Sequence, residues 1–308
     1  MKKAFNYLLI VAGVIALSLS AVSCEEDQLN PESVISVSQT EMNDFDKWLE
    51  VNYMQPYNID FKYRYEMNES DMNYFTIPAS YECSVIMAHL VKYLCIEAYD
   101  EVAGITFTRT FFPKMFFLTG EWEYRNNGTI ILGTAEGGKK IFLAGVNLLP
   151  QVMSGGYGGM DDPVEALNHY YIKTIHHEFT HILNQTKDFP VEFTTITGSG
   201  YVADSWNEEP YESEHLSYGF ITDYSQYSED EDFAEMLSEY VTHSQEWWDQ
   251  QVEAAGDAGQ YIEAKKDIVK NYMLDTFNID IDVLRATVLR RQNEVWQGKV
   301  ILDSVDIQ

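Results

Sequence analysis

Positively charged residues are scarce in this 308-residue chain. It holds 20 lysines and arginines against 49 aspartates and glutamates, which gives a formal net charge of −29. A surface this acidic repels phosphate backbones and anionic lipid head groups. The composition therefore argues against nucleic acid as a partner. Any attachment to a membrane must come from an anchor and not from a basic patch.

Cysteine is also scarce, with three residues at positions 24, 83 and 95. Cys83 and Cys95 lie in an apolar stretch that we expect to be helical. Twelve residues of helix rise about 18 Å, which is too far for a disulfide. We therefore predict two buried thiols that act as small hydrophobes, and the cysteine spacing indicates no metal site.

The apolar run at residues 8–19 is too short, and lies too early, to span a membrane in the mature protein. Two lysines precede it and small residues follow it, so residues 1–23 are typical of a secretory signal. The sequence Ala-Val-Ser before Cys24 reads as a lipobox, and we expect Cys24 to be lipidated. The alternative is ordinary cleavage that leaves Cys24 as a stray thiol. The acidic residues 25–27 resemble a surface-export tag, which predicts the outer face of an outer membrane.

What the chain has in quantity is apolar and aromatic side chains, at 45% and 14% of its residues. Such a composition excludes disorder over most of the chain. Mixed strands and helices come first and helices follow, which predicts an α+β fold. The expected division is a signal peptide at 1–23, a lipidated tether at 24–37, an N-terminal α+β part at 38–158, active-site helices and a loop at 159–250, and C-terminal helices at 251–308.

Hydrophobic periodicity and turn residues predict the individual elements. A capping box of Ser38 and Glu41 should begin a helix that Pro56 ends. Short strands are expected at 59–65, 116–118, 129–132 and 140–143, the last three as an antiparallel meander. Further helices are expected at 80–99, from Asp162 to about 185, and at 229–245, 257–275 and 282–296. Residues 186–227 lack periodicity, and a loop of that length is usually functional.

The sequence His177-Glu178-Phe-Thr-His181 lies within the helix that begins at Asp162. His177 and His181 are one turn apart on one helix face, so both imidazoles can bind one metal ion. Glu178 projects close enough to take a proton from a water on that ion. The alternative is an amphipathic helix with surface histidines. His176 has Thr180 four residues on, so we expect it to pack or to face solvent.

A catalytic zinc needs a third protein ligand and an open position. No histidine follows at the spacing of the extended motif, so that ligand must come from elsewhere. Glu231 opens a second helix 50 residues after His181 and is the candidate. The alternative is a capping box with Ser228. Glu235 and Glu239 share the face of Glu231, or they are solvated surface.

These segments resemble the substrate import-associated zinc metallohydrolase lipoproteins, which are found beside TonB-dependent import systems. The resemblance covers nearly the whole mature chain. It rests on HEFTH, on the segment TDYSQYSEDEDFAEMLSEYV, and on Pro56-Tyr-Asn-Ile59, Leu132-Gly-Thr134 and Ile281-Asp-Val-Leu-Arg285. A more distant similarity is to the catalytic domain of anthrax lethal factor, where HEFGH is followed by a tyrosine seven residues before a zinc-binding glutamate. Thr180 stands where that domain has glycine.

The resemblance implies a gluzincin-like zinc metallopeptidase with a zincin-like α+β fold, in which a mixed antiparallel sheet packs on the HExxH helix. It places Glu231 as the zinc ligand and Tyr224, seven residues earlier, as a phenol facing the site. Glu178 would then be the base, and Tyr224 would donate a hydrogen bond to the oxyanion. Glu235 would accept the far N–H of a histidine ligand.

The expected substrate is a peptide or protein, and the expected partners are a TonB-dependent transporter and its substrate-binding lipoprotein. Two alternatives stay open. One is an accessory lipoprotein that binds glycan or peptide, with a non-catalytic metal site and with its 21 tyrosines and 6 tryptophans as stacking platforms. The other is a metal-dependent hydrolase of a non-peptide amide. An intact Glu178 argues against the first, because a structural site needs no base.

Overall fold

The computed structural model describes residues 41–70, 73–74, 76–125 and 128–307. The predicted signal peptide, Cys24, the tether and Ser38 lie outside the described residues. Residues from Met42 onward form one structural unit. Among the described residues, no helix combines the length and apolar character that a membrane crossing requires.

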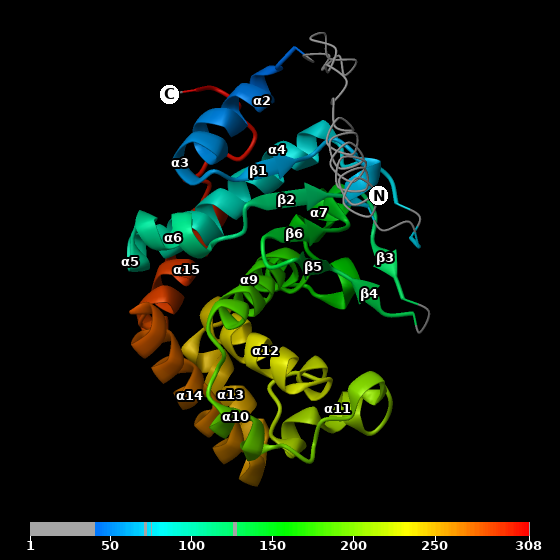
Figure 1. Cartoon of the computed structure of the whole chain (residues 1–308). Helices are drawn as coiled ribbons and strands as arrows, with labels where there is room; N and C mark the ends of the chain where they lie inside the picture. The colour runs from blue at the N-terminus through cyan, green and yellow to red at the C-terminus, as the bar shows by residue number, and fades with distance from the viewer. Residues whose placement is uncertain (1–40, 71–72, 75, 126–127, 308) are drawn as a thin grey trace, which may run out of the picture. The chain divides into compact units, whose positions relative to one another are not determined.

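A four-stranded sheet forms the upper part of this unit (Figure 1). Its strands, in spatial order, are β1 (Asp60–Lys62), β2 (Met115–Leu118), β6 (Lys140–Leu143) and β5 (Gly133–Glu136). β1 pairs parallel to β2, and β2 pairs parallel to β6, while β5 runs antiparallel to β6. A separate antiparallel pair, β3 (Glu123–Tyr124) and β4 (Ile130–Ile131), projects beside the sheet.

The predicted antiparallel meander is therefore wrong, although all four predicted strands are present. The chain from β1 to β2 crosses over through helices, and a crossover of that length permits parallel pairing. The chain from β2 to β6 leaves the sheet to form the β3–β4 pair before it returns. Within the four-stranded sheet, β5 and β6 are joined by a tight turn at the two glycines 137–138, and they pair antiparallel. Alternation of polar and apolar residues predicts a strand but does not predict which strand it pairs with.

Three long helices are each built from consecutive helical segments. The first contains α2 (Asp44–Leu49), η1 (Glu50–Met54) and α3 (Gln55–Tyr57), and the second contains α4 (Tyr81–Leu90), η3 (Val91–Ile96) and α5 (Glu97–Ala103). The third contains α8 (Pro163–Leu167), η6 (Asn168–Ile172) and α9 (Lys173–Thr186). It begins as predicted, because the Asp162 side chain accepts a hydrogen bond from the Val164 amide.

The other described helices are α6 (Ile105–Phe111), α7 (Leu149–Met153), α10 (Val191–Ile196), α11 (Tyr211–Glu214), α12 (Glu229–Thr242), α13 (Gln245–Ala254), α14 (Gly259–Phe277) and α15 (Ile281–Trp296). Short 3-10 turns are η2 (Met67–Glu69), η4 (Val146–Leu148), η5 (Tyr157–Gly159), η7 (Ala203–Ser205), η8 (His215–Tyr218), η9 (Tyr224–Gln226) and η10 (Gly256–Ala258).

The first helix begins later than predicted. Its capping box consists of Asn43 and Asp46, with Glu41 before the helix. Pro56 lies inside the last turn, and Asn58 ends the helix in a left-handed conformation. Both thiols, Cys83 and Cys95, are free and buried, as predicted.

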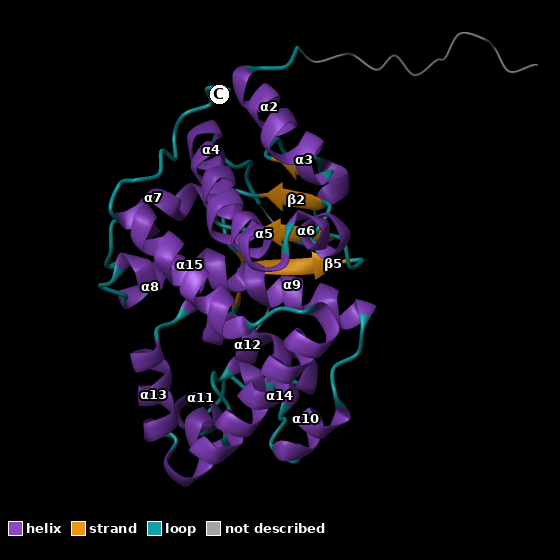
Figure 2. Cartoon of the chain, turned by 90° about the vertical axis from the view of Figure 1, so that its left-hand side faces the viewer, coloured by secondary structure: helices purple, strands orange, loops and turns teal. Residues whose placement is uncertain are grey.

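Helix α9 lies directly against β5 and β6, and α12 packs on α9 from the side away from the sheet (Figures 1 and 2). Gly133, at the start of β5, permits this close approach. A Cβ at Gly133 would lie 2.7 Å from the Phe142 carbonyl oxygen and 2.8 Å from Cγ2 of Thr174 on α9. The edge strand therefore runs next to the helix that carries the two histidines.

Candidate metal centre

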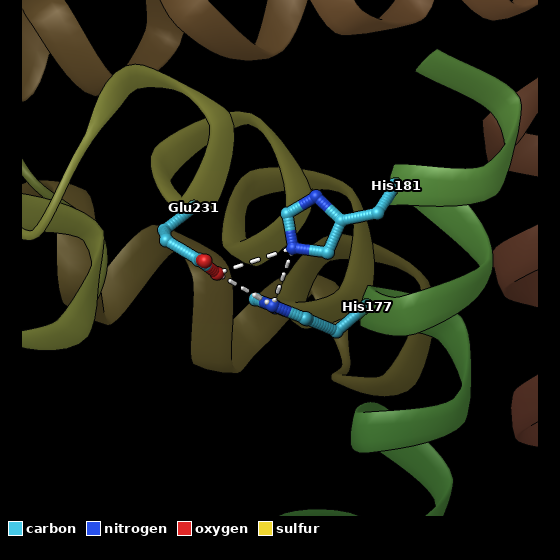
Figure 3. A group of neighbouring side chains, drawn as sticks. All are labelled: His177, His181 and Glu231. Carbon is cyan, nitrogen blue, oxygen red and sulfur yellow. Dashed lines mark hydrogen bonds and ion pairs between the residues drawn. The ribbon is translucent and has the colours of Figure 1, made fainter. Parts of the chain in front are cut away.

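The two histidines of the HExxH sequence face each other across one turn of α9. Their Nε2 atoms lie 3.1 Å apart, and the ring planes are nearly perpendicular (Figure 3). His177 is buried and His181 is partly buried. The alternative of two surface histidines is thereby contradicted for His177.

Glu231, on α12, brings a carboxylate to the same point. Its Oε2 lies 2.9 Å from Nε2 of His177 and 3.2 Å from Nε2 of His181 (Figure 3). Ser228 is the N-cap of α12, and its hydroxyl accepts a hydrogen bond from the Glu231 amide. The cap therefore uses the backbone of Glu231, and its carboxylate stays available to the histidines.

These three donor atoms fit a zinc ion. They lie within 4.8 Å of one another, and they comprise two imidazole nitrogens and one carboxylate oxygen. Four tetrahedral ligands with zinc bonds of 2.0–2.2 Å lie about 3.3 Å from one another. The observed separations of 2.9–3.2 Å match that spacing closely.

Glu235, one turn after Glu231, orients the other nitrogen of His177. Its Oε1 lies 2.8 Å from Nδ1 of His177. Its Oε2 accepts hydrogen bonds from Nζ of Lys173 at 3.0 Å and from Oγ1 of Thr222 at 2.8 Å. Glu239 lies 3.2 Å from the same lysine. Glu235 and Glu239 are both buried, which rules out the interpretation of solvated helix surface.

Mutual contact shifts the pKa values of these groups in opposite directions. Burial alone would lower the pKa of His177, but the carboxylates of Glu231 and Glu235 raise it to about 10. Burial alone would raise the pKa of Glu231, but His177 and His181 hold it well below its usual range. The pKa of Glu235 is lowered as well, since Lys173 and His177 outweigh its burial.

The three donor atoms lie in a cleft of about 860 Å³. Strands β4 and β5, helices α9 and α12, and the segment before α12 all contribute to its walls. Its lining includes Glu178 and Tyr224, the predicted base and phenol, together with Gly133, Thr134, Arg125, His169, Trp206, His215 and Trp247. Glu178 is largely buried. All five residues predicted for the chemistry, namely His177, Glu178, His181, Tyr224 and Glu231, thus meet in one cleft.

Tyr224 is held by aromatic packing beside the histidines. Its ring centroid lies 6.1 Å from that of His177 and 5.1 Å from that of Trp206. Burial and the nearby Glu231 carboxylate raise the pKa of the phenol, although Arg125 hydrogen-bonds it and acts in the opposite direction. The phenol is therefore protonated at neutral pH and can donate a hydrogen bond.

His176, which precedes the motif, and Thr180, which lies within it, have structural roles. His176 is fully buried, and its Nδ1 lies 3.2 Å from the Tyr99 hydroxyl. Burial lowers the pKa of His176 to about 4, so it packs as a neutral side chain. Thr180 is also buried, and its hydroxyl donates to the His176 carbonyl at 2.7 Å. This hydrogen bond explains why threonine is tolerated at that position of the helix.

Residues of this site that the sequence pattern did not reveal include Lys173, Thr222 and Arg125. A signal existed only for Lys173, which precedes His177 by one helical turn and so shares its face. Thr222 lies in the aperiodic segment 186–227, and Arg125 lies just after β3. Neither position carries a pattern that predicts its neighbours.

Comparison with known proteins agrees with this geometry. Residues 38–282 match the family described as "Putative zinc-binding metallo-peptidase". The chain belongs to this family. It is also similar to a crystal structure described as a "putative zinc-binding metallo-peptidase from Bacteroides caccae ATCC 43185", with 37% sequence identity and a TM-score of 0.71. That match covers 89% of this chain and all of the other.

No curated protein matches the chain. The family and the solved structure confirm the predicted family, the zincin-like α+β fold class and zinc as the cofactor.

Proposed function

We propose that this family member is a zinc-dependent peptidase whose metal ligands are His177, His181 and Glu231. The observation that carries the proposal is the convergence of these three donor atoms in a cleft that also holds Glu178. A site that only stabilised the fold would be closed by a fourth protein ligand. Among the described residues, three donors and no fourth converge there.

Bound zinc would supply a Lewis acid that activates a water molecule and polarises the scissile carbonyl. Glu178 would take the proton from that water and pass it to the leaving amine. Tyr224 would donate a hydrogen bond to the oxyanion as its charge develops. Glu235 would keep His177 in the tautomer and orientation that direct Nε2 into the cleft.

The strand beside this cleft supports a peptide as the substrate. β5 is the last strand of the described sheet on this side, and Gly133 and Thr134 from it line the cleft. An extended peptide binds such an edge through main-chain hydrogen bonds. This placement would lay a peptide along α9, beside the two histidines, and favours a peptide over a small amide.

We also propose that the protein is an outer-membrane lipoprotein, anchored through Cys24, on the cell surface, and that it works beside a TonB-dependent transporter and its substrate-binding lipoprotein. The support is the lipobox, the acidic residues that follow it, and the resemblance of the chain to import-associated lipoproteins.

The test is hydrolysis of a peptide library by the purified protein, with and without a zinc chelator. Glu178→Gln is the diagnostic variant, because an amide cannot take the proton. It should retain zinc, measured by mass spectrometry, and lose turnover. A wild-type protein that binds zinc but cleaves no peptide would favour the alternative of an accessory binding lipoprotein. Full turnover in Glu178→Gln would contradict the assigned base.

A further inference from the structure

Two columns of ionisable side chains face each other between the helix of the HExxH sequence and α12. Members of each column recur at four-residue intervals or multiples of them, which places them on one helix face. One column consists of Glu165, Lys173, His177 and His181, and the other of Glu231, Glu235, Glu239 and His243. We call this set the charge ladder.

Contacts within the charge ladder are consecutive, and carboxylates alternate with nitrogen-bearing side chains from the metal centre outward. Glu231 contacts His177, and His177 contacts Glu235. Lys173 lies 3.0 Å from Glu235 and 3.2 Å from Glu239. His243 continues the series, at 3.0 Å from Glu239 and 3.2 Å from Glu165. The proposed metal centre is thus one end of a longer buried network.

Lys173 holds the central place in the charge ladder. Its side chain is 14% exposed, and those of Glu235 and Glu239 are 3% and 8% exposed. Two carboxylates buried this deeply need a positive charge between them, because an unpaired buried charge is strongly destabilising. Lys173 supplies that charge to both at once.

The contacts of Glu235 show how Lys173 acts on the metal centre. One carboxylate oxygen is held by Lys173 and Thr222, and the other therefore faces Nδ1 of His177. With Nδ1 engaged, Nε2 of His177 is the nitrogen left to face the cleft. Without the hydrogen bonds to its Oε2, the Glu235 carboxylate would be free to rotate. The His177 imidazole would then lose the contact that orients it.

We propose that Lys173 is a positioning residue of the zinc site, which orients Glu235 on His177 and thereby sets the affinity for zinc. The inference rests on the proposed function only in that it takes His177 as a zinc ligand. Lys173 does not touch the zinc-binding atoms, and its effect passes through the Glu235 carboxylate.

The experiment compares zinc affinity in the full-length protein and in Lys173→Met, by competition with a chromophoric chelator. Methionine keeps the length of the side chain and removes its charge. Removal of a group that orients a metal ligand lowers affinity about 10–100-fold, and we expect a loss of that size. Unchanged affinity in folded Lys173→Met would overturn the proposal.

Lys140→Met is the matched control. The Lys140 side chain is 13% exposed, close to the 14% of Lys173, and it lies 3.1 Å from the Glu69 carboxylate. It lies on β6, outside the charge ladder. We expect this variant to lose thermal stability and to keep wild-type zinc affinity. An equal loss of zinc affinity in both variants would mean that breaking any buried ion pair loosens the site, and would overturn the specific role of Lys173.

Two further variants keep the test decisive if Lys173→Met does not fold. Thr222→Val removes the second hydrogen bond to the same oxygen of Glu235 and leaves no buried charge unpaired. It should lower zinc affinity by a smaller factor, while Lys173→Arg should retain much of the affinity. Wild-type affinity in Thr222→Val would overturn the proposal. Because no peptide is used, a protein that cleaves nothing would refute the proposed activity and leave this result unaffected.

Discussion

Glu231 serves two purposes with two different parts of the residue. Its amide donates to Ser228 and completes the N-terminal cap of α12, while its carboxylate lies 2.9 Å and 3.2 Å from the two histidines. The sequence had presented cap and ligand as alternatives. The structure shows that Ser228 provides the cap without the Glu231 side chain, so the two functions can be separated by mutation.

We predict that Glu231→Gln lowers zinc affinity by orders of magnitude, because a neutral amide is a far weaker ligand than a carboxylate. Ser228→Ala should leave zinc affinity nearly unchanged and destabilise the protein by about 0.5–2 kcal/mol through loss of the cap. Zinc titration and urea unfolding of both variants check this. If Glu231→Gln kept its zinc while Glu235→Gln lost it, the ligand would be Glu235, one helical turn further on.

Tyr224 lines the cleft beside His177, and its phenol is protonated at neutral pH because its pKa is raised. We predict that Tyr224→Phe keeps its packing on Trp206 and its zinc, and lowers kcat about 10²–10³-fold, as the loss of one oxyanion donor does. Tyr227→Phe is the control, since Tyr227 stacks on Tyr224 but does not line the cleft. A rise in KM with unchanged kcat would mean that the phenol binds the substrate and does not act in the transition state.

At the scale of elements, His243 connects the C-terminal end of α12 to α8 and α15. Its side chain contacts Glu239 and Glu165, and its carbonyl accepts a hydrogen bond from Nε of Arg285 on α15. Burial alone would lower the pKa of His243, but the two carboxylates raise it to about 10. The imidazole is therefore charged in the folded protein over the whole neutral range.

This shift predicts a pH dependence of stability. A pKa raised above the ordinary 6.5 means that the stabilisation is fully present below about pH 6.5 and is lost as the pH rises through about 10. The difference in melting temperature between wild type and His243→Gln should therefore be largest near pH 6 and shrink by pH 10. Thermal unfolding across that range, with zinc chelated, measures it.

His89→Gln is the control for this prediction. Nε2 of His89 donates a hydrogen bond to the Ser304 carbonyl, 2.8 Å away, and burial lowers the pKa of His89. Because the pKa of His89 is lowered and that of His243 is raised, any stabilisation by His89 is lost as the pH falls and not as it rises. A constant difference between wild type and His243→Gln from pH 6 to 10 would show that His243 acts through packing alone.

Elements with a strong local signal were predictable, and their pairings were not. Asp162 and Pro163 indicate the start of the α8–α9 helix, and that helix ends within one residue of the expected position. By contrast, β1 and β2 pair in parallel although more than 50 residues of sequence separate them, and no turn sequence predicts that pairing. Helix α13 was missed, although Ser244 caps it, because its short apolar pattern follows α12 directly.

At the scale of the whole molecule, the residues of the site also divide into those that the local sequence predicts and those that only the fold brings together. His177, Glu178 and His181 follow from spacing within one helix, and Glu231 follows from the need for a third ligand. Lys173, Thr222 and Glu235 meet only because α9, the segment before α12 and α12 itself are folded together. The groups that would bind zinc, and Glu235 beside them, were therefore predicted from the sequence, whereas Lys173 and Thr222 required the fold.

The whole chain is strongly acidic, with a formal net charge of −29, and this decides how it can be held at a membrane. A protein of this charge is repelled by anionic head groups, so attachment should depend on the acyl chains at Cys24. We predict that Cys24→Ser moves the protein from the membrane fraction to the soluble fraction. Immunoblots of fractionated cells, before and after a high-salt wash, measure this.

Cys83→Ser is the matched control, because it removes a thiol that is buried in α4 and cannot be acylated in the folded protein. It should stay in the membrane fraction and lose only stability. High salt screens charge and leaves acyl insertion intact, so wild type and Cys83→Ser should both resist the wash. If Cys24→Ser also remained on membranes after the wash, a contact other than the lipid would hold the protein there. A protein partner, or a signal peptide that stays uncleaved in this variant, would then be the explanation, since the charge of the chain opposes direct binding to anionic lipid.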